Sequence, residues 1–375
     1  MSRSYRAVFA RGGTSKALLF RIDDLPSREQ WDEIFLAAMG SPDPHARQLD
    51  GMGGGVSSLS KVCVVGPPTR DDADVDYTFA QVQIRESFVD YGGNCGNMLS
   101  AVAPFALSEG LIDLPDGPAT VRVHNTNTNT IIEASFVVEE GRAVESGGTS
   151  IPGVSGTGAP VELSFVRPGG AITGRTLPAG SAMSLLTAGD GQVVEASLVD
   201  VATACVFVSA SDLALLGTEL PDTIESTPGL LQRLAALRNA GSVAMGIAGD
   251  VTAAQRSRLV PLIAVVSAPS AYLTMSGERI DAASHDLAVR VISNGQAHRA
   301  LPVTGGLCLA AAARIEGTVP SRLSRPTERA IRIATPSGVI EFDARLASGG
   351  NPIDVERGSI VRTTRQLFRG EVQIR

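Results

Sequence analysis

Lysine is nearly absent from this chain, and its two lysines stand in segments rich in glycine and serine. The sequence has 32 lysines and arginines in total, and only Lys16 and Lys61 are lysines. Arginine stays protonated, whereas a buried ammonium can lose its proton and act as a base. The two lysines are therefore candidates for a catalytic base. The alternative is that both are ordinary loop cations in an arginine-rich composition.

A cysteine stands where a helix is expected to begin. Residues 92–97 form a turn of glycine, asparagine and cysteine, and the apolar stretch after it predicts a buried helix from about Met98 to Glu109. A helix start favours a thiolate over a thiol, because backbone N–H groups and the helix dipole stabilise negative charge there. Cys95 is thus predicted to take part in proton transfer. The other cysteines lie in apolar runs and are predicted to be buried and inert: Cys63, Cys205 and Cys308.

The composition limits the kinds of partner. The net charge of −7 argues against binding to nucleic acid or to an anionic membrane, since both need a basic surface. A small anionic substrate remains compatible, because a few cations and helix N-termini can form a local site. No apolar run of about 18 residues and no signal-peptide core are present, so a cytoplasmic location is expected. A homodimer is also compatible with the sequence.

The elements that position these residues predict two lobes of α+β structure. In the first half we expect a hairpin around the turn with Lys16, a helix from Ser27 to Met39, and strands over Lys61–Val65 and Tyr77–Arg85. The second half repeats this order in outline, with strands over Val193–Leu198, Cys205–Val208 and Leu262–Val266, and helices beginning at Ser211 and Thr227, then over Ala282–Ile292 and Leu307–Ile315. We expect lobes at 1–186 and 187–375, with the last strands able to return to the first lobe.

Each predicted lobe has a central helix with a glycine-containing start. The second of these starts includes Thr304, Gly305 and Gly306. If the two helix starts face one another, their N–H groups and dipoles would bind carboxylates. The sequence therefore favours a site for an anionic small molecule.

Five ordered motifs in the first hundred residues, together with later ones around His124, Gly156 and His298, resemble the PrpF family: Arg11–Lys16, Gly40–Asp43, Gln48–Gly54, Ser57–Lys61 and Gly93–Asn97. The resemblance covers nearly the whole chain. It implies a fold like diaminopimelate epimerase, with two similar lobes and the site in the cleft. It also implies cofactor-independent proton movement on unsaturated polycarboxylates such as 2-methylaconitate, methylitaconate or 4-oxalomesaconate. The matching lysine and cysteine are Lys61 and Cys95.

Moving a double bond by a 1,3-shift requires a base at one carbon, a proton donor at another, and fixed donors for the dienolate between them. Lys61 fits the base, and Cys95 fits delivery or orientation of the second proton. Lys16 is expected to be structural or to bind a carboxylate. The residues expected to bind substrate are Arg11, Gly12, Thr14, Ser15, Lys16, Ser57, Ser58, Asn94, Gly96, Asn97, His298, Thr304, Gly305 and Gly306.

Two other functions stay open from the sequence. A two-base racemase would need a second thiol opposite Cys95, for which Cys308 is the candidate, although Thr304 occupies the expected helix start. A carboxylate-binding accessory protein of an aconitase-like enzyme would need no turnover. No metal or cofactor is expected, because the histidines lack ligands at metal-binding spacing and the glycine-rich segment before Lys61 lacks the ending of a phosphate-binding loop.

Overall fold

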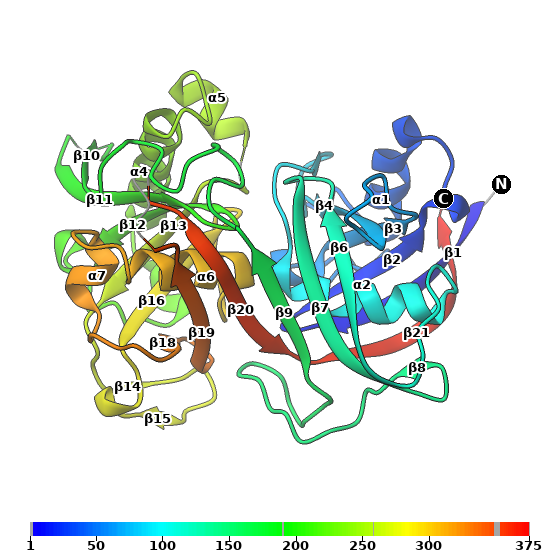
Figure 1. Ribbon diagram of the computed structural model, residues 1–375. Helices are drawn as coiled ribbons and strands as arrows, with labels where there is room; N and C mark the ends of the chain where they lie inside the picture. The colour runs from blue at the N-terminus through cyan, green and yellow to red at the C-terminus, as the bar shows by residue number, and fades with distance from the viewer. Residues whose placement is uncertain (1–2, 190, 258, 349–352, 375) are drawn as a thin grey trace. The chain divides into compact units, whose positions relative to one another are not determined.

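The chain forms two compact units in a computed structural model that describes residues 3–189, 191–257, 259–348 and 353–374 (Figure 1). Unit 1 comprises Met1–Ser164 and Val361–Arg375, and unit 2 comprises Phe165–Ile360. The chain leaves unit 1 within strand β9 (Val161–Val166) and returns within strand β20 (Val355–Arg362). The boundary expected after residue 186 falls inside a strand of unit 2, β10 (Ser184–Thr187).

Unit 1 is built on one mixed sheet. Its strands lie in the order β21–β1–β2–β3–β4–β6–β7, with β5 beside β4, and β8 and β9 beside β7. Their bounds are β1 (Arg3–Gly12), β2 (Ser15–Arg21), β3 (Lys61–Gly66), β4 (Val75–Val82), β5 (Val89–Asp90), β6 (Gly117–Asn125), β7 (Thr130–Glu139), β8 (Arg142–Ala143) and β21 (Thr364–Ile374). The pairs β2–β3 and β4–β6 are parallel, whereas β21–β1, β1–β2, β3–β4 and β6–β7 are antiparallel.

Two helices cover opposite faces of the unit 1 sheet (Figure 1). Helix α1 (Trp31–Met39) packs on one face, which we call the outer face. On the outer face Phe35 stacks on Phe20 of β2 with ring centroids 5.9 Å apart. Helix α2 (Gly96–Ser108) packs on the other face, which we call the inner face, against β1, β2, β3 and β4 and is buried along nearly all of its length. Side chains alternate between the two faces along each strand, so a residue's register decides which helix it meets.

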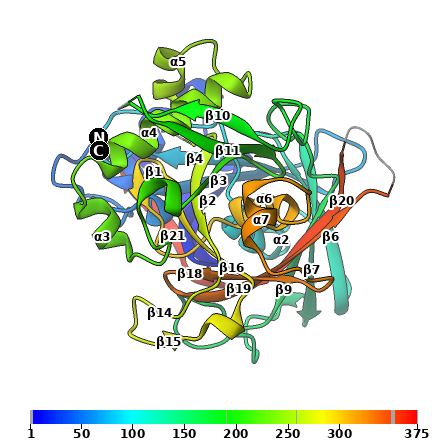
Figure 2. The same cartoon turned by 90° about the vertical axis from the view of Figure 1, so that its left-hand side faces the viewer.

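Unit 2 has a sheet in the order β10–β11–β12–β13–β16–β18–β19–β20, with β17 beside β16 and a separate hairpin of β14 and β15. The further bounds are β11 (Val193–Asp200), β12 (Ala204–Ser209), β13 (Leu262–Ser267), β14 (Tyr272–Leu273), β15 (Arg279–Ile280), β16 (Leu287–Ser293), β17 (Gln296–Ala297), β18 (Ile331–Thr335) and β19 (Gly338–Leu346). The helices are α3 (Pro221–Ser226), α4 (Leu230–Ala244), α5 (Val251–Arg256), α6 (Val303–Ala312) and α7 (Val319–Leu323). Figure 2 shows α6 and α7 together between β11 and β19.

The two units repeat one topology. In unit 1 the strands β1, β2, β3, β4, β6 and β7 pair in the alternating sense antiparallel, parallel, antiparallel, parallel, antiparallel. In unit 2 the strands β11, β12, β13, β16, β18 and β19 pair in the same sequence of senses. The buried helix lies between the fourth and fifth strand in both series, as α2 and as α6. The prediction of two similar α+β lobes, each with a central helix, is therefore confirmed.

The helix predicted over Ala282–Ile292 is wrong. Only Ala282–Ser284 is helical, as a 3₁₀ turn, and Leu287–Ser293 form strand β16 in the middle of the sheet. Both faces of this strand are covered, so its apolar residues run on without alternation, and such a run cannot be told from a buried helix by periodicity. The β-branched residues Val289, Val291 and Ile292 were the signal for a strand.

Other helix starts also differ from the sequence predictions, and α6 begins at Val303 rather than at Leu307. Ser27 makes no capping hydrogen bond, and residues 28–30 form a 3₁₀ turn before α1 begins at Trp31. The helix expected from Ser211 is a single 3₁₀ turn, Ser211–Leu213. Helix α4 begins at Leu230 because Gly229 has a φ of 76°, which a helix does not accommodate. The starts are less predictable than the helices themselves.

Candidate active site

Cys95 is the residue that caps the start of helix α2. It has extended backbone angles, and its side chain lies on the inner face of the unit 1 sheet with 8% of the residue exposed. Its Sγ lies 4.0 Å from Oγ of Ser15 on β2. It also interacts electrostatically with Tyr77 on β4. Two strands of the sheet thus hold the cysteine at the positive end of a buried helix.

Lys61 is the first residue of strand β3 and points to the same inner face. Its ammonium donates a hydrogen bond of 2.6 Å to Oε1 of Gln81, the residue directly opposite on β4. The Nζ atom also lies 4.8 Å from the centroid of the Phe79 ring. Only 8% of the residue is exposed. The lysine is therefore fixed by one polar and one cation–π contact rather than extended into solvent.

Cys63 and Tyr77 connect Lys61 with Cys95. Cys63 follows Lys61 by two residues, so both side chains point to the same face. Its Sγ lies 3.8 Å from the Tyr77 hydroxyl, and it interacts electrostatically with both Cys95 and Lys61. Burial raises the pKa of the Cys63 thiol and of the Tyr77 phenol well above their ordinary values. Both groups stay protonated. Together with Lys61 and Cys95 they form one cluster on the inner face of the sheet, the Lys61–Cys95 cluster.

The glycine turn between β1 and β2 packs directly on the start of α2. Asn97 Nδ2 donates to Thr14 Oγ1 at 3.2 Å, and Asn97 Oδ1 accepts from the Thr14 backbone N–H at 3.4 Å. A Cβ atom on Gly12 would lie 2.7 Å from the carbonyl oxygen of Asn97 and 2.9 Å from Cα of Met98. Gly13 has a φ of 51°, and a Cβ atom there would also collide with the Asn97 side chain. The glycines let the hairpin approach the helix closely enough to place Ser15 beside Cys95.

Replacing Gly12 by alanine should therefore destabilise unit 1. The atoms that a methyl group would meet belong to the backbone of α2 and cannot rotate away, so the expected loss is about 1–3 kcal/mol of unfolding free energy. Thermal or urea unfolding measures it. Gly148→Ala is the matched control, because a Cβ there meets nothing within 4 Å. Equal stabilities of the two variants would contradict the close approach.

Arg11 and Lys16 lie beside this cluster but point elsewhere. Arg11 donates to the carbonyl oxygens of Gly13 at 3.0 Å and Thr363 at 2.8 Å, so it holds the turn. Lys16 lies with its Nζ 5.5 Å from the ring centroid of Phe9, which packs with the hydrophobic cluster on the α1 side of the sheet. The structure does not bring either cation together with Lys61 and Cys95.

The remaining residues expected in unit 1 surround the two candidate catalytic groups. Ser57 and Ser58 belong to a 3₁₀ turn, Ser57–Leu59, just before Lys61. Gly96 is the first residue of α2 and is buried. Both side-chain amide atoms of Asn94 are buried without a hydrogen-bond partner among the described residues. Asn94 can therefore bind a polar group that the protein itself does not supply.

The residues expected in unit 2 gather at the start of α6. Pro302 precedes the helix, and Thr304, Gly305 and Gly306 lie in its first turn, buried. Gly306 packs against the ring of Phe342 and leaves no room for a side chain. His298 Nδ1 accepts the backbone N–H of Ala300 at 3.0 Å, so a neutral ring carries its proton on Nε2.

Cys308 does not lie at the start of α6. It is the sixth residue of the helix, fully buried, and its thiol donates to the carbonyl oxygen of Val199 at 3.4 Å. Burial raises the pKa of the Cys308 thiol well above its ordinary value. The second thiol that a two-base racemase requires is therefore not at the position corresponding to Cys95.

A model of the PrpF protein family matches residues 3–375. The chain belongs to the PrpF family. Its relatives include the 3-methylitaconate isomerase of Eubacterium barkeri, 39% identical over 372 residues that cover 98% of this chain and 96% of the relative. The 4-oxalomesaconate tautomerase of Pseudomonas putida is 36% identical over 372 residues, covering 98% and 95%. The family membership predicted from the motifs is confirmed.

Solved structures confirm the fold as well. A crystal structure of methylitaconate-delta-isomerase superimposes with a TM-score of 0.80 at 38% identity, covering 100% of this chain and 96% of the other. A hydroxyproline epimerase of Agrobacterium vitis gives a TM-score of 0.56 at 12% identity, covering 99% and 93%. The second likeness concerns the fold alone. The epimerase-like α+β fold expected for a PrpF protein is therefore present.

Two residues of this PrpF chain at the site were not predicted. Gln81 contacts Lys61, and the pairing of β3 with β4 was the signal that could have found it. Arg362 lies in the last part of the chain, and its Nε donates to Asn97 Oδ1 at 3.2 Å. It is 3% exposed, and burial lowers the pKa of its guanidinium to about 9. Nothing in the local sequence distinguishes Arg362 from the many other arginines.

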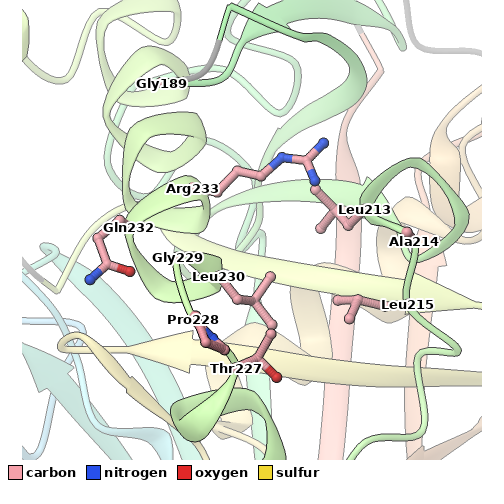
Figure 3. A pocket seen from close by; sticks show the side chains of 10 residues that line it. All are labelled: Gly189, Leu213, Ala214, Leu215, Thr227, Pro228, Gly229, Leu230, Gln232 and Arg233. Carbon is pink, nitrogen blue, oxygen red and sulfur yellow. The ribbon is translucent and has the colours of Figure 1, made fainter.

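A cavity of about 640 Å³ lies in unit 2, at the start of helix α4 (Figure 3). Apolar residues such as Leu213 and Leu230 line it, and Arg233 reaches the carbonyl oxygen of Asp212 at 3.2 Å. The described residues that line it carry no carboxylate, thiol or imidazole. Across residues 3–189, 191–257, 259–348 and 353–374, no group of three or more histidine, cysteine, aspartate or glutamate residues could hold a metal, and no helix is long and apolar enough to cross a membrane.

Proposed function

We propose that this PrpF-family chain is an isomerase that moves a double bond by a 1,3-proton shift in an unsaturated polycarboxylate, without a cofactor. The observation that carries the proposal is the Lys61–Cys95 cluster in unit 1. There a buried lysine and a cysteine at the start of a helix lie on the same face of the sheet, beside Cys63 and Tyr77. The named activities of two relatives, an isomerase of methylitaconate and a tautomerase of oxalomesaconate, support it.

The reaction divides between two groups. The neutral Lys61 amine takes a proton from the carbon at one end of the allylic system, and the electron pair of that C–H bond moves into a dienolate. The double bond then re-forms one position along, as a proton is returned to the carbon at the other end. Cys95 delivers or orients this second proton. Each step exchanges one proton, so the reaction needs no redox partner or cofactor.

Fixed donors hold the substrate and its developing charge. The first N–H groups of α2 have no acceptor within the helix, and they and the amide of Asn94 are suited to a carboxylate. In unit 2, taken by itself, we propose that Thr304, Gly305 and His298 at or before the start of α6 are likewise suited to bind a carboxylate. The dienolate gains more from such donors than the neutral carbon acid does, and this difference lowers the barrier.

A two-thiol racemase is the weaker proposal because of Cys308. Its thiol lies inside α6 and is bonded to a backbone carbonyl, whereas a second base would have to reach substrate. A carboxylate-binding accessory protein without turnover is a further alternative, but it gives no role to a lysine buried beside a cysteine cluster.

Proton NMR in D2O tests the proposal and separates the alternatives. Purified protein, dialysed after EDTA treatment, is incubated with 3-methylitaconate, 2-methylaconitate and 4-oxalomesaconate. We expect deuterium at the allylic carbon and a displaced double bond with at least one acid. No exchange with any of them would favour the accessory protein. In parallel incubations with hydroxyproline or diaminopimelate, inversion of the configuration at the α-carbon with uptake of deuterium would favour the racemase. Activity that returns only on adding a metal ion or nucleotide would contradict cofactor independence.

A further inference from the structure

The side chain of Gln81 forms a hydrogen bond with the Lys61 ammonium. Gln81 on β4 lies directly opposite Lys61 on β3, and its Oε1 accepts a hydrogen bond from the Lys61 Nζ at 2.6 Å. It is 1% exposed. A hydrogen bond from a charged donor in a buried place is stronger than one at the surface, so this contact can determine where the lysine sits.

The amide of Gln81 can adopt only one orientation. Its Nε2 donates to two backbone carbonyl oxygens, that of Ser60 at 2.8 Å and that of Ser57 at 3.1 Å. A flipped amide would turn its NH2 group toward the ammonium and its oxygen toward two carbonyl oxygens, losing three hydrogen bonds at once. The oxygen therefore always faces Lys61.

We propose that Gln81 is a positioning residue that fixes the reactive lone pair of Lys61. A neutral amine has two N–H donors and one lone pair. When one N–H is held by Gln81 Oε1, the lone pair can point in only a narrow range of directions, and the amine meets the substrate C–H bond without first having to be ordered. Gln81 does not touch substrate in this role. Its kinetic part rests on the proposed function of Lys61 as the base.

A second buried glutamine supplies the matched control. Gln48, also 1% exposed, donates to Ser60 Oγ at 2.7 Å and to Ser41 Oγ at 2.9 Å, and its Oε1 accepts the Gly55 N–H at 3.0 Å. It stabilises the loop before Lys61 but does not contact the ammonium. A purely structural role of Gln81 would make the two glutamines behave alike.

Gln81→Met, Gln81→Glu and Gln48→Met separate positioning from stability. In Gln81→Met we expect kcat to fall by about 10- to 100-fold with little change in KM, because the base is misplaced while substrate binding is kept. In Gln81→Glu a carboxylate beside the ammonium favours its charged form, so the acidic limb of the kcat profile moves to higher pH. The other titratable groups of the cluster, Cys63 on β3, Tyr77 on β4 and Cys95 before α2, are unchanged in all three variants. Gln48→Met should lower the melting temperature and leave the shape of the pH profile unaltered.

NMR of the lysine side chains gives a readout that does not depend on turnover. With lysine labelled with ¹³C and ¹⁵N, the two lysines give two sets of side-chain signals, and Lys16 serves as an internal reference. The Lys61 signal should shift in both Gln81 variants, while the Lys16 signal stays. Unchanged Lys61 signals in both would overturn the proposal, even if no acid is turned over. Shifted signals with wild-type kcat and pH profile would overturn it as well.

Discussion

Replacing Lys61 by methionine should lower kcat by roughly two to four orders of magnitude, the usual contribution of a general base. Methionine is unbranched like lysine, only one atom shorter, and it can still pack on Phe79, so the fold should survive. What it lacks is the amine that accepts the carbon-bound proton. Steady-state kinetics with the acid that exchanges deuterium measures the loss, and circular dichroism checks the fold.

The remaining lysine offers the control for this prediction. Lys16→Met removes the other lysine of the chain, but Lys16 packs on Phe9 on the opposite face of the sheet, so kcat should stay within a few-fold of wild type. Lys61→Arg should be nearly as poor as Lys61→Met, since a guanidinium does not give up its proton. If Lys61→Met turns over at the wild-type rate, Lys61 has no part in the proton shift.

Much of the fold could be predicted because local patterns and the repeat agree. The hairpin of β1 and β2, the strand at Lys61 and the buried helix after Cys95 each have a turn or glycine signal at the ends, and the second half shows the same order. The helix predicted over Ala282–Ile292 shows the limit of this reasoning. Strand β16 is covered on both faces, so tertiary burial removed the alternation that identifies a strand.

The site could be predicted only where its chemistry is visible in short segments. Cys95 could be placed because glycines and a helix start surround it, and Lys61 because lysine is so rare here. Lys16 is equally rare and also stands beside glycines, yet its side chain points to the other face of the sheet. Successive residues of a strand point to opposite faces, so a shift of one position along the strand decides which face a side chain reaches. Arg362 reaches Asn97 from the last strands of unit 1, and such a contact depends on how distant segments assemble.

The four cysteines differ in ways that a labelling experiment can read. Cys63, Cys205 and Cys308 are between 0% and 1% exposed, whereas Cys95 is 8% exposed at the start of α2. Burial also holds the Cys63 and Cys308 thiols in the protonated, unreactive form. Iodoacetamide should therefore label Cys95 first, and a bound polycarboxylate should protect it. First labelling at Cys308 would mean that the cluster on the inner face of unit 1 is not the reactive centre.

Cys95→Ser should lower kcat by about two to four orders of magnitude while substrate binding is kept. Serine preserves the size and the hydrogen bonding at the helix start, including the neighbourhood of Ser15, but a hydroxyl is a far weaker acid than a thiol and exchanges its proton less readily. Comparison with the lysine variants then assigns the roles. If Cys95→Ser loses all exchange of the allylic proton while Lys61→Met retains it, the thiol is the base and the lysine the assisting group. If both exchange the first proton but neither completes the shift, the two groups act together in returning the second.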